Sequence, residues 1–354
     1  MTMQEAIEAR HSVRAYKDLP LSKEIVKLLE DELVKLNNEG QLHIQLICNE
    51  PKAFQGTMAK YGKFRNANNY LVMAGKKAED LDERIGYYGE HLVLLAQTLG
   101  LNTCWVGLSY SKVPGTYVLD EDEKIACYIA IGYGETQGSG HKIKTVEQVS
   151  NASDITPSWF KRGVEAALLA PTAVNQQKFS FEHVGVKNNC HLIRAKKGFS
   201  MIGYTKMDLG IAKYHFEIGA GEVNFEWGMN IEQVREYTLS LAGVTEDQAF
   251  GEDILNFRLE GKIFVCLWLG GGRYDMKDGV SRIALKLSPD RNIELREQFT
   301  AVTPAYHWNK THWSDVYYEE MDETIVKGLI KESYQLIASK LPKAIRSKYL
   351  SECD

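Results

Sequence analysis

Two guanidiniums, an imidazole and a hydroxyl occur within five positions near the start of the chain, at Arg10, His11, Ser12 and Arg14. Arginine offers a planar, permanently charged fork of donors, serine adds a short hydroxyl donor, and the free N–H groups of a helix end also favour anions. Such a cluster could bind a phosphate. Charged runs are more often solvated surface features without a ligand. Other segments of the chain are therefore needed to distinguish a phosphate site from a solvated surface run.

Three later segments combine glycine or proline with polar side chains, as ligand-binding loops do. Residues 100–108 read GLNTCWVGL, and residues 130–135 read AIGYGE, a strand that ends in a glycine turn. Lys142 and Lys144 follow that turn, and residues 170–177 read APTAVNQQ. No Ser-His-Asp set, HExxH motif or GxxxxGK phosphate loop is apparent, so hydrolysis and nucleotide-triphosphate chemistry have no support.

Composition favours small-molecule chemistry in a chain long enough for two or three domains. The 354 residues carry a net charge of −5, whereas proteins that coat nucleic acids or anionic membranes need a basic excess. No apolar run approaches the ~18 residues that span a bilayer and no leader-like segment opens the chain, so we expect a cytoplasmic protein. The cysteines show no metal-type spacing, which predicts free thiols and neither a metal site nor a disulfide framework. They are Cys48, Cys104, Cys127, Cys190, Cys266 and Cys353.

Hydrophobic spacing predicts an α+β fold with a repeated helix-strand unit. Residues 21–36 place apolar side chains at helical spacing behind Ser22, a potential N-cap. After a turn at 37–40, the segment 42–46 alternates as a half-buried strand is expected to. Residues 157–184 repeat this plan with a longer loop between helix and strand.

A second pair of segments indicates an internal duplication. Residues 87–107 and 206–228 each read as a long apolar helix that ends at a glycine and runs into a short turn. Three glycine pairs share one offset of 121 positions: Gly89 with Gly210, Gly100 with Gly221 and Gly107 with Gly228. Chance could align glycines in a chain that has 29 of them. The matching helix-strand units nevertheless favour a duplication, which would let one chain mimic a two-fold dimer.

Taken in order, the RHSVR, GLNTCWVGL, AIGYGE and APTAVNQQ segments resemble the FMN-dependent nitroreductase family over residues 1–228. In that family the flavin site lies at a dimer interface, where an Arg-Ser-Arg cluster of one subunit meets an A-P-S-x-x-N-x-Q loop of the other. Ordinary members carry the loop at the end of the first helix, whereas this chain has residues 37–40 there and the loop only at 170–177. It therefore resembles a compact subgroup in which the subunits have become tandem halves. The halves would be about 1–150 and 151–228, with one complete flavin site per chain.

The resemblance implies roles for residues of the first half. Arg10 and Ser12, assisted by His11, would bind the FMN phosphate or ribityl chain. Arg14 would lie near flavin N1 and O2, where a fixed positive charge stabilises the anionic reduced flavin. The backbone N–H groups near flavin N5 would come from Val106 and Gly107, which with Arg14 are the candidate catalytic residues. A basic pair that either lies near the phosphate or is merely solvated would be Lys142 and Lys144.

The second half would close the flavin pocket with Pro171, Thr172, Asn175 and Gln177, of which Asn175 is the expected direct polar contact. The implied reaction is ping-pong: NADH or NADPH reduces FMN and leaves, and a nitroaromatic, quinone or related electron-poor acceptor enters the same pocket. The alternative is a flavin-binding sensor or adaptor. We expect a monomer or a weak homodimer, because the usual dimer would be mimicked within one chain.

Residues 229–354 form a predicted second domain. The PAYHWNKTHWSDV run at 304–316 and the segment 235–264 resemble the YjbR family, whose members are small α+β domains similar to the CyaY fold. That family is often labelled DNA-binding, yet 229–354 holds 16 Lys and Arg against 20 Asp and Glu, which does not favour nucleic acid. In the sensor alternative, this domain would make the protein or nucleic-acid contact. A polar and aromatic cluster could line a ligand site or form a surface turn anchored by tryptophans; it comprises His307, Asn309, Lys310, His312 and Trp313.

Overall fold

The computed structural model describes residues 1–78, 80–187, 190–251, 253–269 and 282–349. It divides into two compact units, Met1–His183 with Ala195–Asn224, and Val184–Arg194 with Phe225–Asp354. Both units mix helices and strands, which confirms the predicted α+β class. The sequence predicted a domain boundary at 228, whereas the compact units change after Asn224, and the segment 184–194 joins the second unit.

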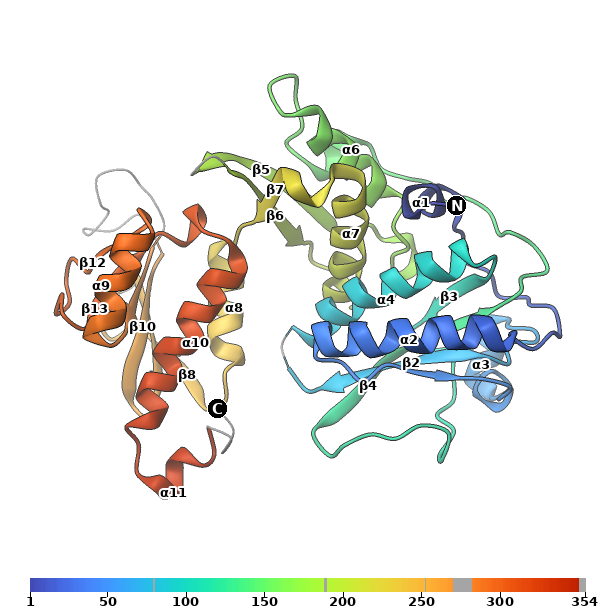
Figure 1. The fold of residues 1–354 in the computed structure, drawn as a ribbon, viewed down its shortest axis with the longest axis horizontal. Helices are drawn as coiled ribbons and strands as arrows, with labels where there is room; N and C mark the ends of the chain where they lie inside the picture. Colours follow the sequence, from blue (N-terminus) through green and yellow to red (C-terminus); the bar gives the residue numbers. More distant parts are fainter. Residues whose placement is uncertain (79, 188–189, 252, 270–281, 350–354) are drawn as a thin grey trace. The chain divides into compact units, whose positions relative to one another are not determined.

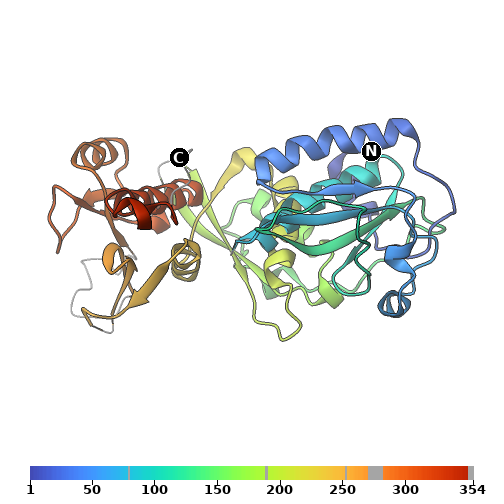
Figure 2. The same cartoon turned by 90° about the horizontal axis from the view of Figure 1, so that it is seen from below.

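The first unit is built around a four-stranded antiparallel sheet in the order β1-β2-β4-β3. Its strands are β1 (Gln45–Ile47), β2 (Tyr70–Lys76), β3 (Asn102–Val106) and β4 (Glu123–Gly132). Its helices are α1 (Met3–Ala9), α2 (Lys23–Gly40), α3 (Thr57–Gly62), α4 (Leu81–Thr98), α5 (Val146–Val149), α6 (Ser158–Leu168) and α7 (Thr205–Ala220), with short 3₁₀ turns η1 (Lys52–Phe54), η2 (Ala173–Asn175) and η3 (Glu222–Asn224). Helix α4 packs on β2, β3 and β4, and α2 packs on α4 and β1 (Figure 1, Figure 2).

Helix α2 begins as predicted but ends later. The Ser22 hydroxyl accepts the Ile25 N–H at 3.3 Å, which confirms the predicted N-cap. The predicted turn at 37–40 is wrong, because the helix continues to Gly40 and the chain reverses at Gln41, with φ 48°. A Cβ at Gly40 would lie 2.6 Å from the ring of Tyr88, so glycine here serves close helix packing and not a turn.

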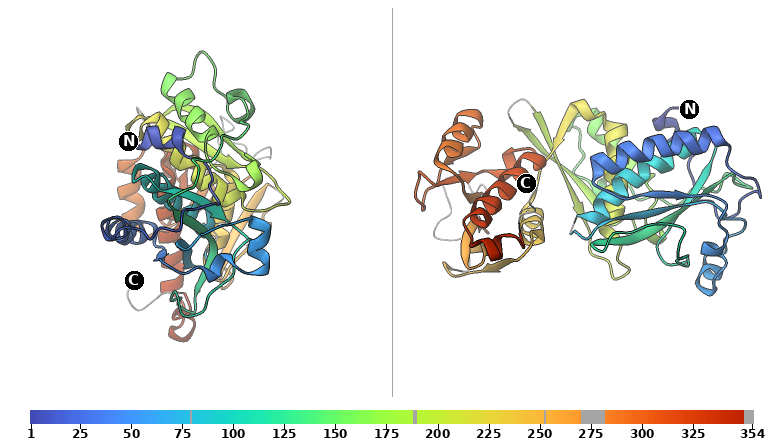
Figure 3. Two further views of the ribbon diagram at one scale, coloured as in Figure 1. Left: turned by 90° about the vertical axis from the view of Figure 1, so that its right-hand side faces the viewer. Right: turned by 60° about the horizontal axis from the view of Figure 1, so that its bottom comes forward.

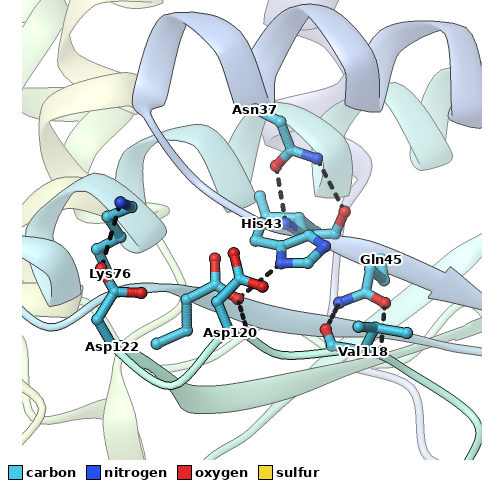
Figure 4. A network of polar contacts seen from close by, with 9 residues as sticks. Asn37, His43, Gln45, Lys76, Val118, Asp120 and Asp122 are labelled. Atoms are coloured by element: carbon cyan, nitrogen blue, oxygen red, sulfur yellow. Dashed lines mark hydrogen bonds and ion pairs between the residues drawn. The ribbon is translucent and has the colours of Figure 1, made fainter. Parts of the chain in front are cut away.

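A network of polar contacts fixes the edge strand β1, as Figure 4 shows. The Asn37 side chain accepts the Ile44 N–H at 2.7 Å and donates to the Ile44 carbonyl at 2.9 Å. The Gln45 amide exchanges hydrogen bonds of 2.7 and 3.0 Å with the Val118 backbone. Nδ1 of His43 lies 2.7 Å from the Glu123 carboxylate. These bonds fasten α2, β1 and the segment before β4 to one another.

Helices α4 and α7 cross in close contact at two glycines. A Cβ at Gly86 would lie 2.1 Å from the Met207 carbonyl oxygen, and one at Gly210 would lie 2.0 Å from the Glu83 carbonyl oxygen. A 3.1 Å ion pair between Glu83 and Lys213 also bridges the two helices. Gly86 and Met207 are 121 positions apart, the offset of the predicted repeat, so equivalent positions face each other as in a two-fold interface. The duplication itself stays a prediction.

A three-stranded sheet follows in the chain, in the order β5-β6-β7, with β6 and β7 parallel. Its strands are β5 (Phe179–Lys187), β6 (Cys190–Lys197) and β7 (Phe225–Trp227). The predicted helix and strand around the 170–177 loop are confirmed by α6 and β5.

The second unit contains a six-stranded antiparallel sheet in the order β12-β13-β11-β10-β9-β8. Its strands are β8 (Val244–Asp247), β9 (Ile254–Leu259), β10 (Lys262–Trp268), β11 (Ile283–Lys286), β12 (Val302–Pro304) and β13 (Trp313–Val316). Its helical segments are α8 (Ile231–Ser240), α9 (Pro289–Gln298), η4 (Tyr318–Glu320), α10 (Glu323–Ser339) and α11 (Lys343–Arg346). Helix α10 packs across β9, β10 and β11 and buries the main apolar core of this unit (Figure 3). Within the described ranges of both units, none of the helices is long and apolar enough to cross a membrane.

Candidate functional site

The first unit contains a cavity of about 510 Å³. Protein sites for small molecules have volumes of this order. The first half of the unit contributes Ser12, Arg14, residues 61–64, residues 104–109 and Cys127. The second half contributes residues 171–174, Ile202, Tyr204, Met207, Asp208 and Ile211. The cavity therefore has one wall from each predicted half, which we call the first wall and the second wall.

The RHSVR segment is placed at the first wall by pairing with β3. Ser12 forms a parallel bridge with Thr103, and the Val13 N–H donates to the Thr103 carbonyl at 3.0 Å. This pairing sets Ser12 and Arg14 beside Cys104 at the cavity. The Arg14 side chain is exposed and has no hydrogen bond or ion pair with any described residue. A permanent charge held open in a cavity wall suits an anionic or electron-rich ligand.

Gly107 follows the end of β3 and lies under the ring of Tyr204. A Cβ at Gly107 would lie 2.6 Å from Cζ of Tyr204 and 2.7 Å from its hydroxyl oxygen. Tyr204 stands immediately before α7 in a left-handed conformation, with φ 62°, and burial raises the pKa of its hydroxyl. Sequence reasoning identified Val106 and Gly107 but missed Tyr204, because a lone tyrosine before a helix belongs to no motif.

The loop that contributes residues 171–174 to the second wall contains strained backbone. Val174, Asn175 and Gln177 have φ angles of 46°, 56° and 44°. Asparagine tolerates this left-handed region, but a β-branched valine there is a genuine outlier. The turn is closed by the Thr172 hydroxyl, which accepts the Gln177 N–H at 3.1 Å. Backbone strain of this kind persists only where the surroundings enforce it and is concentrated at functional sites.

Side chains of the strained loop bind the segment that carries the predicted basic pair. Asn175 Nδ2 and Gln177 Nε2 each donate to the Lys142 carbonyl at 2.9 Å. Lys144 donates its N–H to Gln177 Oε1 at 2.9 Å and its Nζ to the Gln177 carbonyl at 2.5 Å. Burial lowers the pKa of Lys144, and the nearby charge of Lys178 adds to this. These four predicted site residues fasten two loops together and do not line the cavity, so their direct contact with flavin stays a prediction.

A buried carboxylate, Asp208, completes the second wall and is 2% exposed. Its Oδ1 accepts the Ala173 N–H at 2.9 Å, and its Oδ2 accepts from Gln176 Nε2 at 2.6 Å. Burial raises the pKa of Asp208 to about 6, although the two hydrogen bonds act in the opposite direction. Sequence reasoning missed this residue. A signal was available, because the aspartate stands between Met207 and Leu209 in a predicted long apolar helix.

Arg10 does not line the cavity. It is 3% exposed, its Nη2 donates to the Leu169 carbonyl at 3.4 Å, and its Nε lies 3.8 Å from the Glu90 carboxylate. Glu90 also accepts from Trp105 Nε1 at 2.8 Å and lies 2.9 Å from His215 Nε2. Burial lowers the pKa of Arg10, and the charge of Glu90 opposes this. Arg10 is thus buried and paired with Glu90 in this structure. Its direct contact with the FMN phosphate stays a prediction.

His11 lies beside the glycine-rich segment that precedes His141. A Cβ at Gly138 would lie 2.7 Å from the His11 Cβ and 3.1 Å from the Ser12 carbonyl oxygen. Burial lowers the pKa of His11, and the charges of Arg10 and His141 add to this. Burial also lowers the pKa of His141, whose Nε2 lies 3.3 Å from the Leu168 carbonyl oxygen. A negative charge beside these imidazoles would oppose this lowering of their pKa values.

The cysteines give no sign of metal or disulfide chemistry in the described residues. Cys48, Cys104, Cys127, Cys190 and Cys266 are free thiols, and Cys353 lies outside the described residues. Burial raises the pKa of the two that line the cavity, Cys104 and Cys127. No group of three or more His, Cys, Asp or Glu side chains suited to a metal was found in the described part of the chain.

The polar and aromatic cluster of the second unit forms an anchored turn. The rings of Trp308 and Trp313 stack at 4.5 Å, and Trp313 is buried. The Asn309 carbonyl accepts the N–H groups of His312 at 3.0 Å and of Trp313 at 2.9 Å. This geometry matches the surface-turn alternative predicted for the cluster.

Fold and site together define a two-domain chain: an α+β unit of the nitroreductase type with a cavity of small-molecule size, and a separate α+β domain. The chain belongs to the family described as "Putative TM nitroreductase", whose model matches residues 2–220. Residues 239–336 match the YjbR family, so the chain also carries a YjbR domain. Both family resemblances found in the sequence are confirmed.

Individual relatives match one part of the chain or the other. The YbdF protein of Escherichia coli O157:H7 is 31% identical over 113 residues, which cover 32% of this chain and 87% of YbdF. A Thermotoga maritima structure described as a putative nitroreductase is 22% identical, with a TM-score of 0.47, over 65% of this chain and 89% of its own. A Desulfovibrio desulfuricans structure of the same description, in complex with FMN, is 19% identical, with a TM-score of 0.35, over 44% of this chain and 99% of its own.

Proposed function

We propose that this protein is an FMN-dependent oxidoreductase that takes a hydride from NADH or NADPH and passes electrons to a nitroaromatic, a quinone or a related electron-poor acceptor in a ping-pong reaction. The observation that carries the proposal is the cavity, where Ser12, Arg14, Val106 and Gly107 share one space with residues 171–174. The family resemblance predicted that these distant residues would form one flavin site. Bound FMN would supply the hydride chemistry of both half-reactions.

The residues that line the cavity suit a flavin ring. Arg14 offers a guanidinium without a partner among the described residues, and the backbone of Gly107 lines the same space, with the Tyr204 ring where a Cβ would otherwise lie. Thr172 supplies a hydroxyl from the opposite wall. The phosphate would bind beside Ser12, which lines the cavity and is followed by Val13 and Arg14.

Each wall would have a separate task in the reaction. On the first wall, Arg14 would orient the ligand and hold a fixed positive charge near it, which favours negative charge that develops during reduction. The N–H groups of Val106 and Gly107 would fix the reactive edge of the ring. On the second wall, the strained loop and Tyr204 would cover the ring and exclude water, which strengthens these electrostatic interactions.

The rim of the cavity supports an apolar, flat acceptor. Leu108, Val174 and Ile202 line the cavity, yet they are 68%, 75% and 55% exposed. Exposed apolar side chains beside a cavity favour ligands that remove them from water. Aromatic nitro compounds and quinones have this character, whereas sugars and small organic acids do not.

Reconstitution followed by steady-state kinetics tests the proposal. The purified protein is incubated with FMN, freed of excess flavin and assayed with NADH and NADPH against a nitroaromatic and a quinone. We expect retained flavin absorbance, oxidation of at least one nicotinamide, and parallel double-reciprocal plots, which a ping-pong reaction produces. Protein that retains no flavin would contradict the proposal. Protein that retains flavin but does not turn over would instead favour the sensor or adaptor alternative.

A further inference from the structure

The loop between β6 and α7 exposes large apolar side chains at its tip. Residues 198–203 read GFSMIG, and within this stretch Phe199 is 86% and Met201 is 94% exposed, while Ile202 is more than half exposed. Single exposed apolar side chains are normal on protein surfaces, but neighbouring ones form a patch that water solvates poorly. Such a patch indicates a surface that a partner covers.

Hydrogen bonds at both ends hold this loop beside the cavity. The Gly198 N–H donates to the Lys178 carbonyl at 2.7 Å, and Gln176 Nε2 donates to the Gly203 carbonyl at 3.0 Å. Both partners belong to the segment that directly follows residues 171–174 of the second wall. The exposed tip therefore has a fixed base on that wall.

The exposed tip continues the rim of the cavity. Ile202 lines the cavity itself, as do Tyr61, Leu108 and Val174, whose side chains are also exposed. We call the whole exposed set the apolar rim: Tyr61, Leu108, Val174, Phe199, Met201 and Ile202. A ligand confined to the cavity would not cover Phe199 and Met201, because they do not line it. The rim as a whole therefore fits a partner larger than the cavity.

The segments that carry the apolar rim are basic. Residues 61–64, 104–109, 171–178 and 196–206 contain no aspartate or glutamate but five lysines: Lys63, Lys178, Lys196, Lys197 and Lys206. Lys196 pairs with Glu182 at 2.8 Å, whereas Lys63 and Lys178 are exposed and form no ion pair within the described part of the chain. Among the lining residues of the cavity, the carboxylate of Asp208 is buried. The net charge of −5 disfavours an anionic partner for the chain as a whole, but this surface has the opposite sign.

We propose that the apolar rim docks on an anionic lipid surface, so that the cavity opens toward the lipid and receives a lipid-soluble quinone as its electron acceptor. Lipid docking rests on the exposed side chains and the local charge alone. The identity of the acceptor rests on the proposed function.

The form of the rim favours lipid over a protein partner. Anchoring side chains in protein interfaces fill shaped pockets near the centre of the contact. A lipid layer needs no such pockets, because apolar side chains enter the acyl boundary while neighbouring lysines stay at the headgroups. Phe199 and Met201 at the loop tip, with Lys197 and Lys206 on its two flanks, have this arrangement. Anionic headgroups would attract these lysines.

A quinone with an apolar tail suits a cavity that opens onto lipid. Its flat, electron-poor head group would enter past Leu108, Val174 and Ile202, while the tail would remain in the lipid. Reduction of the quinone to its quinol takes two electrons and one proton as the hydride that NADH or NADPH gives up, and a second proton from water. The oxidised nicotinamide is the other product.

Vesicle flotation tests lipid docking without flavin or substrate. The whole chain is mixed with vesicles of phosphatidylcholine alone, or of equal parts phosphatidylcholine and phosphatidylglycerol, and the floating fraction gives the partition coefficient. The tip variant is Phe199→Ser combined with Met201→Ser. Ile155→Ser combined with Val223→Ser is the matched control, because Ile155 and Val223 are 94% and 98% exposed but do not line the cavity.

We expect the native protein to bind the anionic vesicles at least about tenfold more tightly than the tip variant, because the tip side chains leave water on insertion. Binding should weaken at high salt and on vesicles without phosphatidylglycerol, and the control should bind as the native protein does. Equal binding of the native protein and the tip variant would overturn lipid docking. So would a native protein that binds neither kind of vesicle, a result that would leave a protein as the partner of the rim. Both results would leave the proposed function intact.

Acceptor assays separate lipid delivery from catalysis. The protein reconstituted with FMN is given NADH or NADPH and either a quinone with a long isoprenoid tail in anionic vesicles or a water-soluble quinone without a tail. The tip variant should lose about tenfold or more in kcat/KM with the vesicle-bound quinone and keep the native value with the soluble one. Equal losses with both quinones would contradict delivery from the lipid. Failure to reduce any acceptor would contradict the proposed function and leave the flotation result standing.

Discussion

The two walls of the cavity differ in what their polar groups bind. On the first wall, the Arg14 guanidinium has no partner among the described residues, and relaxed strand pairing through Thr103 sets its position. On the second wall, the polar groups bind one another: Asp208 holds Ala173 and Gln176, and the backbone is strained at Val174.

This difference indicates a division of work between the halves. Groups without partners on the first wall are available to a ligand, so changes there should alter binding more than stability. Groups on the second wall are already engaged, so changes there should alter stability, loop closure and pH dependence.

The largest effect is expected at the helix crossing that sets both walls. Gly210→Ala would put a Cβ 2.0 Å from a backbone oxygen of Glu83, which cannot move aside as a side-chain tip could. We expect a loss of about 3 kcal/mol in the free energy of unfolding of the first unit, measured by urea denaturation with tryptophan fluorescence. Gly328→Ala in α10 meets no atom within 4 Å and should stabilise its helix slightly. Equal stability of Gly210→Ala and the native protein would contradict the close crossing.

Asp208→Asn should stabilise the protein at neutral pH. The pKa of Asp208 in the folded protein is about 6, above the ordinary value of 3.8, so ionisation disfavours the folded state. This penalty grows as the pH rises from about 4 to about 6 and is complete above that range. Denaturation at pH 8 should show the variant more stable by at most roughly 3 kcal/mol, with the difference vanishing near pH 4. A constant difference across this range would mean that the carboxylate does not titrate with a raised pKa.

Arg14→Ala should impair FMN binding without destabilising the protein. Losing a hydrogen-bonded charge contact costs about 1.5–3 kcal/mol, which corresponds to roughly 10–100-fold in the dissociation constant. Arg14→Lys keeps the charge without the planar fork and should bind with intermediate affinity. Arg65→Ala, which breaks an ion pair with Glu135 outside the cavity lining, is the matched control and should bind normally. Unchanged FMN affinity of Arg14→Ala would remove Arg14 from the site.

The smallest effect is expected at the strained valine. Val174→Asn places a residue that tolerates the left-handed region at φ 46° and removes an exposed apolar side chain. We expect a gain of about 1 kcal/mol in the free energy of unfolding. Val174→Ile keeps the β-branch and should leave stability unchanged. A destabilised Val174→Asn would show that the valine is not strained there.

Sequence patterns correctly predicted the helices and strands whose formation depends on residues close together in the sequence. Apolar spacing and the Ser22 cap were sufficient to find α2, and the 170–177 loop was recognised between its helix and strand. The end of α2 was missed because Gly40 is required by its packing against Tyr88, a contact that local sequence does not contain.

Long-range partners explain what the sequence could not predict about the site. No residue close to Arg10 in the sequence indicates that Arg10 is buried beside Glu90. Asp208 and Tyr204 join the cavity because α7 crosses α4 at Gly86 and Gly210. Asn175 and Gln177 lie in the recognised loop, but the carbonyl that they bind belongs to Lys142, more than 30 residues away in the sequence. The motif resemblance therefore identified more of the lining residues on the first wall than on the second wall, where it missed Tyr204 and Asp208.

A crystal structure of the protein grown with FMN would show directly where the flavin binds. We expect one flavin per chain, with its ring in contact with Arg14 and Gly107 on the first wall and with Thr172 on the second wall. Flavin bound elsewhere, or a cavity without flavin at a saturating FMN concentration, would contradict this expectation.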